Sequence, residues 1–171
     1  MGSSPWAPAS GWLFSEPIVL TRMNGKDVLM FRVGNARGNE VVDASVSVSL
    51  LRDELSPEGH HFRRIHPLEL SRSRSPLFTM TWSVMHEIDE ASPLFGIDLE
   101  DPASGVMGFI ATLKGHDGTY GQTTYVRHIY RLEDLKAGHR FVDVISELPD
   151  GRLMIDYALF HRTEEERSAL A

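Results

Sequence analysis

The fold is decided by residues 106–131, which read VMGFIATLKGHDGTYGQTTYVRHIYR. Residues 115–121, rich in glycine, separate two runs (106–113 and 122–130) that are rich in β-branched and aromatic residues. Both runs are typical of strands. Three glycines spaced by three residues allow positive φ angles and a close approach of the backbone to another surface. The residue types alone thus predict two strands joined by an ordinary surface loop.

Short strands separated by turn residues fill most of the remaining chain. Asn24-Gly25 is a strong two-residue hairpin signal between two apolar runs. In residues 42–50, apolar side chains alternate with aspartate and serine, as expected of a strand buried on one face. Many short strands with little helical periodicity predict an all-β sandwich. The other strand candidates are residues 17–23, 26–34, 61–65, 68–70, 77–85, 140–148 and 152–157.

The two ends of the chain differ from this pattern. Thr163-Glu164-Glu165-Glu166 has the spacing of a capping box, which predicts a short C-terminal helix. A helix of about two turns is marginal alone and needs a surface to dock on. We therefore expect a leader or linker over residues 1–13, disordered at its start, one domain over 14–162, and a helix and tail over 163–171.

Bulk properties narrow the classes of function. The 171 residues carry a net charge of −7 and include no cysteine. This composition fits one soluble globular domain, argues against a nucleic-acid partner, and excludes disulfides and thiolate metal sites. No apolar run approaches the roughly 20 residues of a membrane helix. The first residues lack the basic start and apolar core of a signal peptide.

The sequence contains none of the common enzyme or metal-binding motifs. His60 and His66 share one face of an extended strand but lie about 20 Å apart, at roughly 3.3 Å per residue, so they cannot chelate one ion together. There is no G-x-S-x-G elbow, no P-loop and no dinucleotide fingerprint. We expect no enzyme activity, no cofactor and no metal site. Four arginines, at positions 63, 64, 72 and 74, form a basic patch that is either solvated or meets an acidic partner or lipid headgroups.

Five segments, in order and spacing, resemble the cytoplasmic domain of inward rectifier potassium channels, in particular the prokaryotic members. They are LMFRVGNAR at 29–37, FRRIH with SRSRSP at 62–76, HEIDEASPLF at 86–95, GHRF at 138–141, and DY with FH at 156–161. The resemblance covers nearly all of residues 14–164. Motif residues to which it gives a structural role are Arg32, Asn35, Arg37, His86, Asp89, Ser92, Arg127, His139 and Arg140.

The resemblance implies an immunoglobulin-like β-sandwich, assembled as a fourfold ring around an extension of the ion pore. In that family a glycine loop forms a girdle that narrows the pore, and a fourfold axis brings four copies of one loop together. The matching constriction loop here is Gly115, His116, Asp117, Gly118, Thr119, Tyr120 and Gly121. Within it, His116, Tyr120 and Gly121 are the expected pore-facing residues.

Charged positions depart from the pattern of strongly rectifying members. Those channels have a carboxylate just before the girdle glycine, where this chain has Lys114. Glu58 is retained near the turn at 56–59, but Arg72 and Arg74 stand where those channels have aspartates. A less negative pore focuses cations more weakly, so we expect weak or no polyamine block.

The family's two membrane helices, its selectivity filter and its basic linker have no counterpart in this sequence. We therefore expect a soluble domain excised from a channel, which does not conduct ions alone. The implied partners are a homotetramer formed through the parent channel, potassium ions in the pore, and anionic lipid headgroups or a soluble gating ligand. The implied location is the cytoplasmic face of the bacterial inner membrane. Alternatives are a stand-alone immunoglobulin-like binding module and an unrecognised hydrolase.

Overall fold

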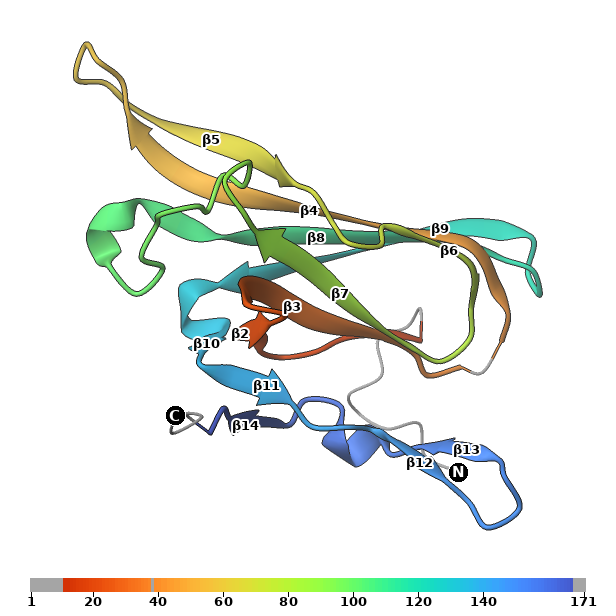
Figure 1. Cartoon of the computed structure of the whole chain (residues 1–171). Helices are drawn as coiled ribbons and strands as arrows, with labels where there is room; N and C mark the ends of the chain where they lie inside the picture. Colours follow the sequence, from red (N-terminus) through yellow and green to blue (C-terminus); the bar gives the residue numbers. More distant parts are fainter. Residues whose placement is uncertain (1–10, 38, 168–171) are drawn as a thin grey trace.

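The computed structural model describes residues 11–37 and 39–167 and is built mostly of strands (Figure 1). The strands are β1 (Trp12–Phe14), β2 (Ile18–Met23), β3 (Lys26–Asn35), β4 (Val41–Leu55), β5 (His61–Leu68), β6 (Arg74–Phe78), β7 (Thr81–Ile88), β8 (Val106–Asp117), β9 (Gln122–Arg131), β10 (Leu135–Ala137), β11 (His139–Phe141), β12 (Ile145–Glu147), β13 (Leu153–Ile155) and β14 (Thr163–Glu165). Short 3-10 turns lie at Pro102–Ser104, Leu132–Asp134 and Tyr157–Leu159. The prediction of an all-β fold is confirmed.

Two five-stranded sheets form an immunoglobulin-like sandwich. The first has the order β1-β3-β2-β10, with β7 paired along β3. The second has the order β5-β4-β8-β9, with β6 paired to the start of β4. Phe31 and Val33 of the first sheet and Val48 and Phe109 of the second belong to one buried apolar cluster. The hydrophobic core therefore lies between the sheets.

Strand β4 follows the predicted alternation over most of its length. Val46, Val48 and Leu50 are buried, and the serines between them lie on the outer face. At its start the prediction is wrong by one residue, because Val41 rather than Val42 is buried. The cause is an irregularity between Val42 and Ser45, where Asp43 has φ 51° and the register of the pairing with β8 shifts.

Strand β1 belongs to the sandwich. Trp12 pairs with Asn35 and is 2% exposed. The domain therefore begins at least two residues before the boundary expected at Phe14. The remaining leader, residues 1–10, lies outside the described residues.

A third, smaller layer packs below the first sheet in Figure 1 and consists of the pairs β11–β14 and β12–β13. The C-terminal helix expected from Thr163 is wrong over the described residues, because Thr163–Glu165 is β14 and pairs with β11. A helix of about two turns has little stability of its own. In its place, the segment forms ladder hydrogen bonds with β11, and Glu166 N donates a further hydrogen bond to Gly138 O.

Candidate functional site

The loop singled out in the sequence is shorter than expected. Gly115, His116 and Asp117 still belong to β8, and only residues 118–121 form the turn to β9. Asp117 holds this turn: its Oδ1 accepts hydrogen bonds from the backbone N of Thr119 (2.8 Å) and of Tyr120 (3.3 Å). Its Oδ2 accepts from Asn39 Nδ2 at 2.6 Å. Asp117 is therefore a buried anchor of the hairpin and is not exposed at its tip.

The reason for a glycine differs among the three positions, although their regular spacing suggested one shared reason. Gly121 has φ 63°, in the left-handed region that glycine favours. Gly115 is buried in β8, where an added Cβ would lie 2.5 Å from Val41 Cγ1 and 3.1 Å from Trp12 Cη2. Gly118 has open space around it, since only Glu40 O, at 3.9 Å, comes near. Only Gly121 needs the backbone freedom that the spacing predicted.

The three residues expected to face a pore are exposed in the single chain. His116 and Gly121 lie at the surface, and Tyr120 is 66% exposed. The tip projects from one end of the second sheet (Figure 1). Exposed side chains at the end of a rigid hairpin are available to another surface; that they face a pore stays a prediction.

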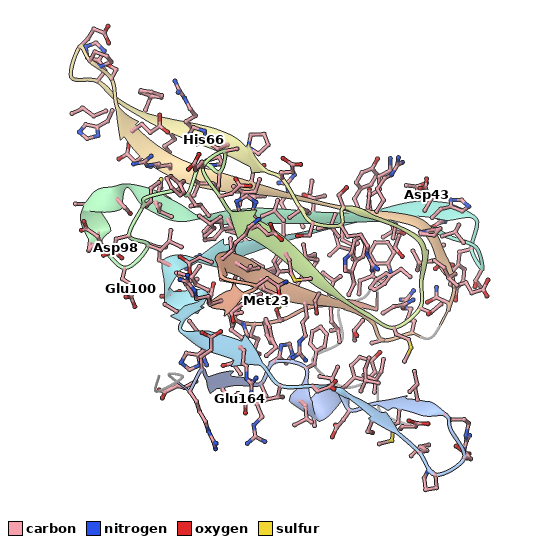
Figure 2. The ribbon with its side chains drawn as sticks, viewed as in Figure 1. Met23, Asp43, His66, Asp98, Glu100 and Glu164 are labelled. Atoms are coloured by element: carbon pink, nitrogen blue, oxygen red, sulfur yellow. The ribbon has the colours of Figure 1, made fainter. Side chains whose placement is uncertain are left out.

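Beside this tip, the outer face of the second sheet carries a cationic row. Lys114, Ser45 and Tyr125 are register partners across β8, β4 and β9, and Arg74 pairs with Ser45 from β6. The Lys114 ammonium lies 5.6 Å from the centroid of the Tyr125 ring. Arg74 lies 3.7 Å from Asp43, which Figure 2 labels near this end of the sheet. Arg127 occupies the next outward position of β9, opposite Thr112.

The remaining charges proposed from the family pattern lie elsewhere. Glu58 lies in the β4–β5 turn, at the opposite end of the same sheet from the β8–β9 tip (Figure 1). A hydrogen bond from Ser56 holds the pKa of the Glu58 carboxyl below its ordinary value. The Arg72 guanidinium stacks 4.7 Å from the centroid of the buried Trp82 ring. The chain thus places Lys114 and Arg74 in one row, whereas Glu58 lies at the other end of the sheet and the Arg72 guanidinium lies over Trp82 of β7.

Two family-motif residues organise the N-terminal half of the domain. Asn35, 1% exposed, donates through Nδ2 to Asn39 O and Phe78 O and accepts from Arg37 N. Arg32 is buried under the third layer, where its Nη2 donates to Val142 O.

The later motif residues also fasten loops and layers. His86 Nδ1 lies 2.6 Å from Glu69 O, which can only accept, so Nδ1 carries the proton and Nε2 accepts from Ser92 Oγ at 2.7 Å. Asp89 Oδ1 accepts from Ala91 N in the same loop. His139 and Arg140 connect β11 to β14 through Thr163 and Glu164.

An aromatic contact between β1 and β9, centred on His128, had no recognisable signal in the sequence. His128, on β9, lies between the rings of Phe14 (centroids 5.2 Å apart) and Tyr130 (4.4 Å). Burial lowers the pKa of His128, and the charge of Asp134 opposes this in part. The three residues come from β1 and β9, far apart in the chain, so only the folded structure reveals their contact.

Among residues 11–37 and 39–167, no three histidine, aspartate or glutamate side chains gather in a metal-binding arrangement. None of the helical turns in those same ranges has the length and hydropathy needed to span a bilayer.

Comparison with known proteins identifies the family. Residues 12–170 match the inward rectifier potassium channel C-terminal domain. The inward rectifier potassium channel Kirbac3.1 of Paramagnetospirillum magnetotacticum is 41% identical over 154 residues, which cover 90% of this chain and 52% of that protein. G protein-activated inward rectifier potassium channel 1 of Bos taurus is 35% identical over 168 residues, covering 95% of this chain and 33% of that protein. The ATP-sensitive inward rectifier potassium channel 12 of Mus musculus is 33% identical over 169 residues, which cover 94% of this chain and 38% of that protein.

This chain spans about half or less of the length of these relatives. The matched family is a potassium channel domain and not a family of enzymes. With 159 of the 171 positions inside the match (12 to 170), the chain belongs to the inward rectifier potassium channel C-terminal domain family.

Proposed function

We propose that the chain is the pore-extending, gating domain of an inward rectifier potassium channel and that it acts as a fourfold ring. The tip of β8–β9 from each copy surrounds the axis and narrows the path of potassium ions. In the parent channel, the ring sits at the cytoplasmic face of the bacterial inner membrane. Without a membrane-spanning pore, the domain has no means of selecting an ion.

The observation that carries this proposal is the exposed, rigidly held β8–β9 tip in a chain that belongs to this family. Asp117 fixes the turn from within the domain, so the exposed residues 118–121 have a defined direction. A closed cyclic ring places four copies of one exposed segment around its axis, and small residues let such copies approach one another closely. The tip combines a fixed direction with two small residues, Gly118 and Gly121, and Tyr120 adds an exposed ring that narrows the path further.

The absence of cysteine from the sequence permits a clean test by single-cysteine crosslinking. The variant Thr119→Cys places one thiol at the tip, and Asp98→Cys places one on an exposed loop at the other end of the molecule (Figure 2). We expect sedimentation equilibrium to reveal tetramers at high concentration. Within them, Thr119→Cys should form disulfide-linked or short-bismaleimide-linked dimers, and Asp98→Cys should not.

Two results would count against the ring. A tetramer in which Asp98→Cys crosslinks and Thr119→Cys does not would place the tip away from the axis. A monomer at every concentration, also when the domain is attached to its membrane segment, would favour the stand-alone binding module.

A further inference from the structure

A cavity of about 1020 Å3 lies between the first sheet and the third layer. Met23, Met30 and Arg32 contribute from β2 and β3, and Phe141 and Val144 from the segment that covers them. Figure 2 labels Met23 on the sheet side, and Glu164 on β14 of the third layer. The volume is that of a site for a small organic molecule, and the lining combines apolar and charged side chains.

The charge of the lining is positive. Four arginines line the cavity, at positions 22, 32, 140 and 167, against two acids, Asp143 and Glu166. The Glu166 carboxylate is already engaged, because it accepts from Thr21 Oγ1 and from the backbone N of Arg22. Asp143 Oδ1 accepts from Ile145 N. Two of the four arginines are paired as well, Arg22 with Asp27 and Arg140 with Glu164. The positive charge that remains to be matched at the cavity therefore centres on Arg32.

Arg32 is the residue that needs a partner. It is 5% exposed, its Nη2 donates to Val142 O, and its guanidinium lies 4.4 Å from the Phe141 ring centroid. Its Nη1 is buried and has no hydrogen-bond partner among the described residues, and no carboxylate there forms an ion pair with it. Burial lowers its pKa to about 10, so it remains charged at neutral pH. The charge of Asp143 raises the pKa of Arg32 in part, but Asp143 forms no ion pair with the guanidinium among the described residues, so Nη1 stays buried and unpaired. An unpaired buried donor is costly, and a bound anion that accepts a hydrogen bond from Nη1 would offset that cost.

We propose that this cavity binds a small organic anion, with a carboxylate or phosphate head at Arg32 and an apolar body against Met23, Met30 and Phe141. Hydrogen bonds between ionised groups are about twice as strong as neutral ones, so the head dominates recognition. The site lies wholly within one chain. Ligand binding at this site does not require the chain to assemble into a ring. Either proposal can therefore be refuted while the other holds.

The test is a titration of the full chain followed by amide NMR signals, at constant ionic strength set with potassium chloride. Hexanoate supplies a carboxylate head with an apolar body, hexanol supplies the body alone, and inorganic phosphate supplies a head alone. We expect hexanoate to shift the signals of Met30, Arg32 and Val142 saturably, and hexanol to bind at least about tenfold more weakly. Displacement of hexanoate by phosphate would assign a phosphate ligand, and no displacement a carboxylate.

Two substitutions remove the site in different ways. Arg32→Gln deletes the charge and should weaken hexanoate binding about tenfold or more. Ser83→Trp keeps Arg32 but fills the cavity from β7. It therefore tests whether hexanoate binds in this cavity even where Arg32→Gln does not fold. Arg162→Gln, an exposed arginine outside the cavity, is the matched control and should bind normally. The proposal is overturned by the absence of saturable hexanoate shifts, by equal binding of hexanol, or by unchanged binding in Ser83→Trp.

Discussion

At the scale of single residues, Gly115 illustrates how a functional-looking motif can have a packing cause. Its position in a glycine loop suggested backbone freedom, yet the residue lies in a strand under Trp12 and Val41. The side-chain-free position lets Trp12 of β1 lie directly on β8. The glycine therefore serves the sandwich core, and the exposed tip begins only after Asp117.

Gly115→Ala should destabilise the domain by about 1–3 kcal/mol, the usual cost of overpacking a close-packed core. The added Cβ would lie 2.5 Å from Val41 Cγ1, closer than real contacts allow. Gly118→Ala is the matched control, with its nearest neighbour at 3.9 Å, and should change the free energy of unfolding by less than about 0.5 kcal/mol. Urea denaturation of the two variants measures the difference. Equal losses would show that the packing at Gly115 has been misjudged.

At the scale of elements, β1 and β9 are connected by an aromatic contact that includes a titratable group. The ring of Phe14 stacks on His128 with an interplanar angle of 12°, and the buried Tyr130 hydroxyl donates to Ser15 O. The two contacts attach β1 and the residue that follows it to the second sheet, although β1 is paired within the first. The edge of the sandwich therefore depends on an uncharged imidazole.

This contact predicts a loss of stability in mild acid. The pKa of His128 in the folded state is lowered from 6.5, so below that pH the unfolded chain binds a proton that the folded chain resists. The stabilisation is present above about pH 6.5 and is lost as the pH falls through the folded-state pKa. His128→Phe should retain the ring contacts and flatten the dependence of unfolding free energy on pH between about 7 and 5.

Chemical denaturation at several pH values checks this prediction. The exposed His60 provides the control, since His60→Phe removes an imidazole that has no such aromatic contact and should leave the pH dependence as in the unaltered chain. An identical slope for His128→Phe and the unaltered chain would contradict the assignment.

At the scale of the whole molecule, the long sheet β5-β4-β8-β9 separates the charges that the family pattern groups together. Lys114 and Arg74 share one row beside the β8–β9 tip, whereas Glu58 lies at the far end of β4. If four copies surround a pore, cationic groups lie near its narrow end. Such a ring would repel polyvalent cations there.

In a channel that carries this domain, spermine block should therefore be weak, and Glu58→Lys should change it little. Lys114→Glu should strengthen the block, because it reverses the sign of a charge beside the constriction. Current recordings across a range of voltages, with spermine on the cytoplasmic side, measure this. Strong voltage-dependent block that disappears in Glu58→Lys would refute the prediction.

The sequence by itself determined the all-β class, the Asn24-Gly25 hairpin, the alternation in β4 and the family. These features depend on local periodicity, turn chemistry and motif order, which are visible along the chain. The C-terminal segment shows where local information stops. Its capping-box spacing favours a helix, but β11 offers ladder partners that only the folded chain brings near.

Tertiary structure alone decided which residues meet. It placed Asp117 inward on Asn39, Trp12 against Gly115, His128 between two rings, and Arg32 beneath Phe141. It also separated Glu58 from Lys114, which the family pattern treats as parts of one pore. These contacts join residues far apart in the chain, and their geometry follows from sheet register and layer packing, which no local pattern of residue types encodes.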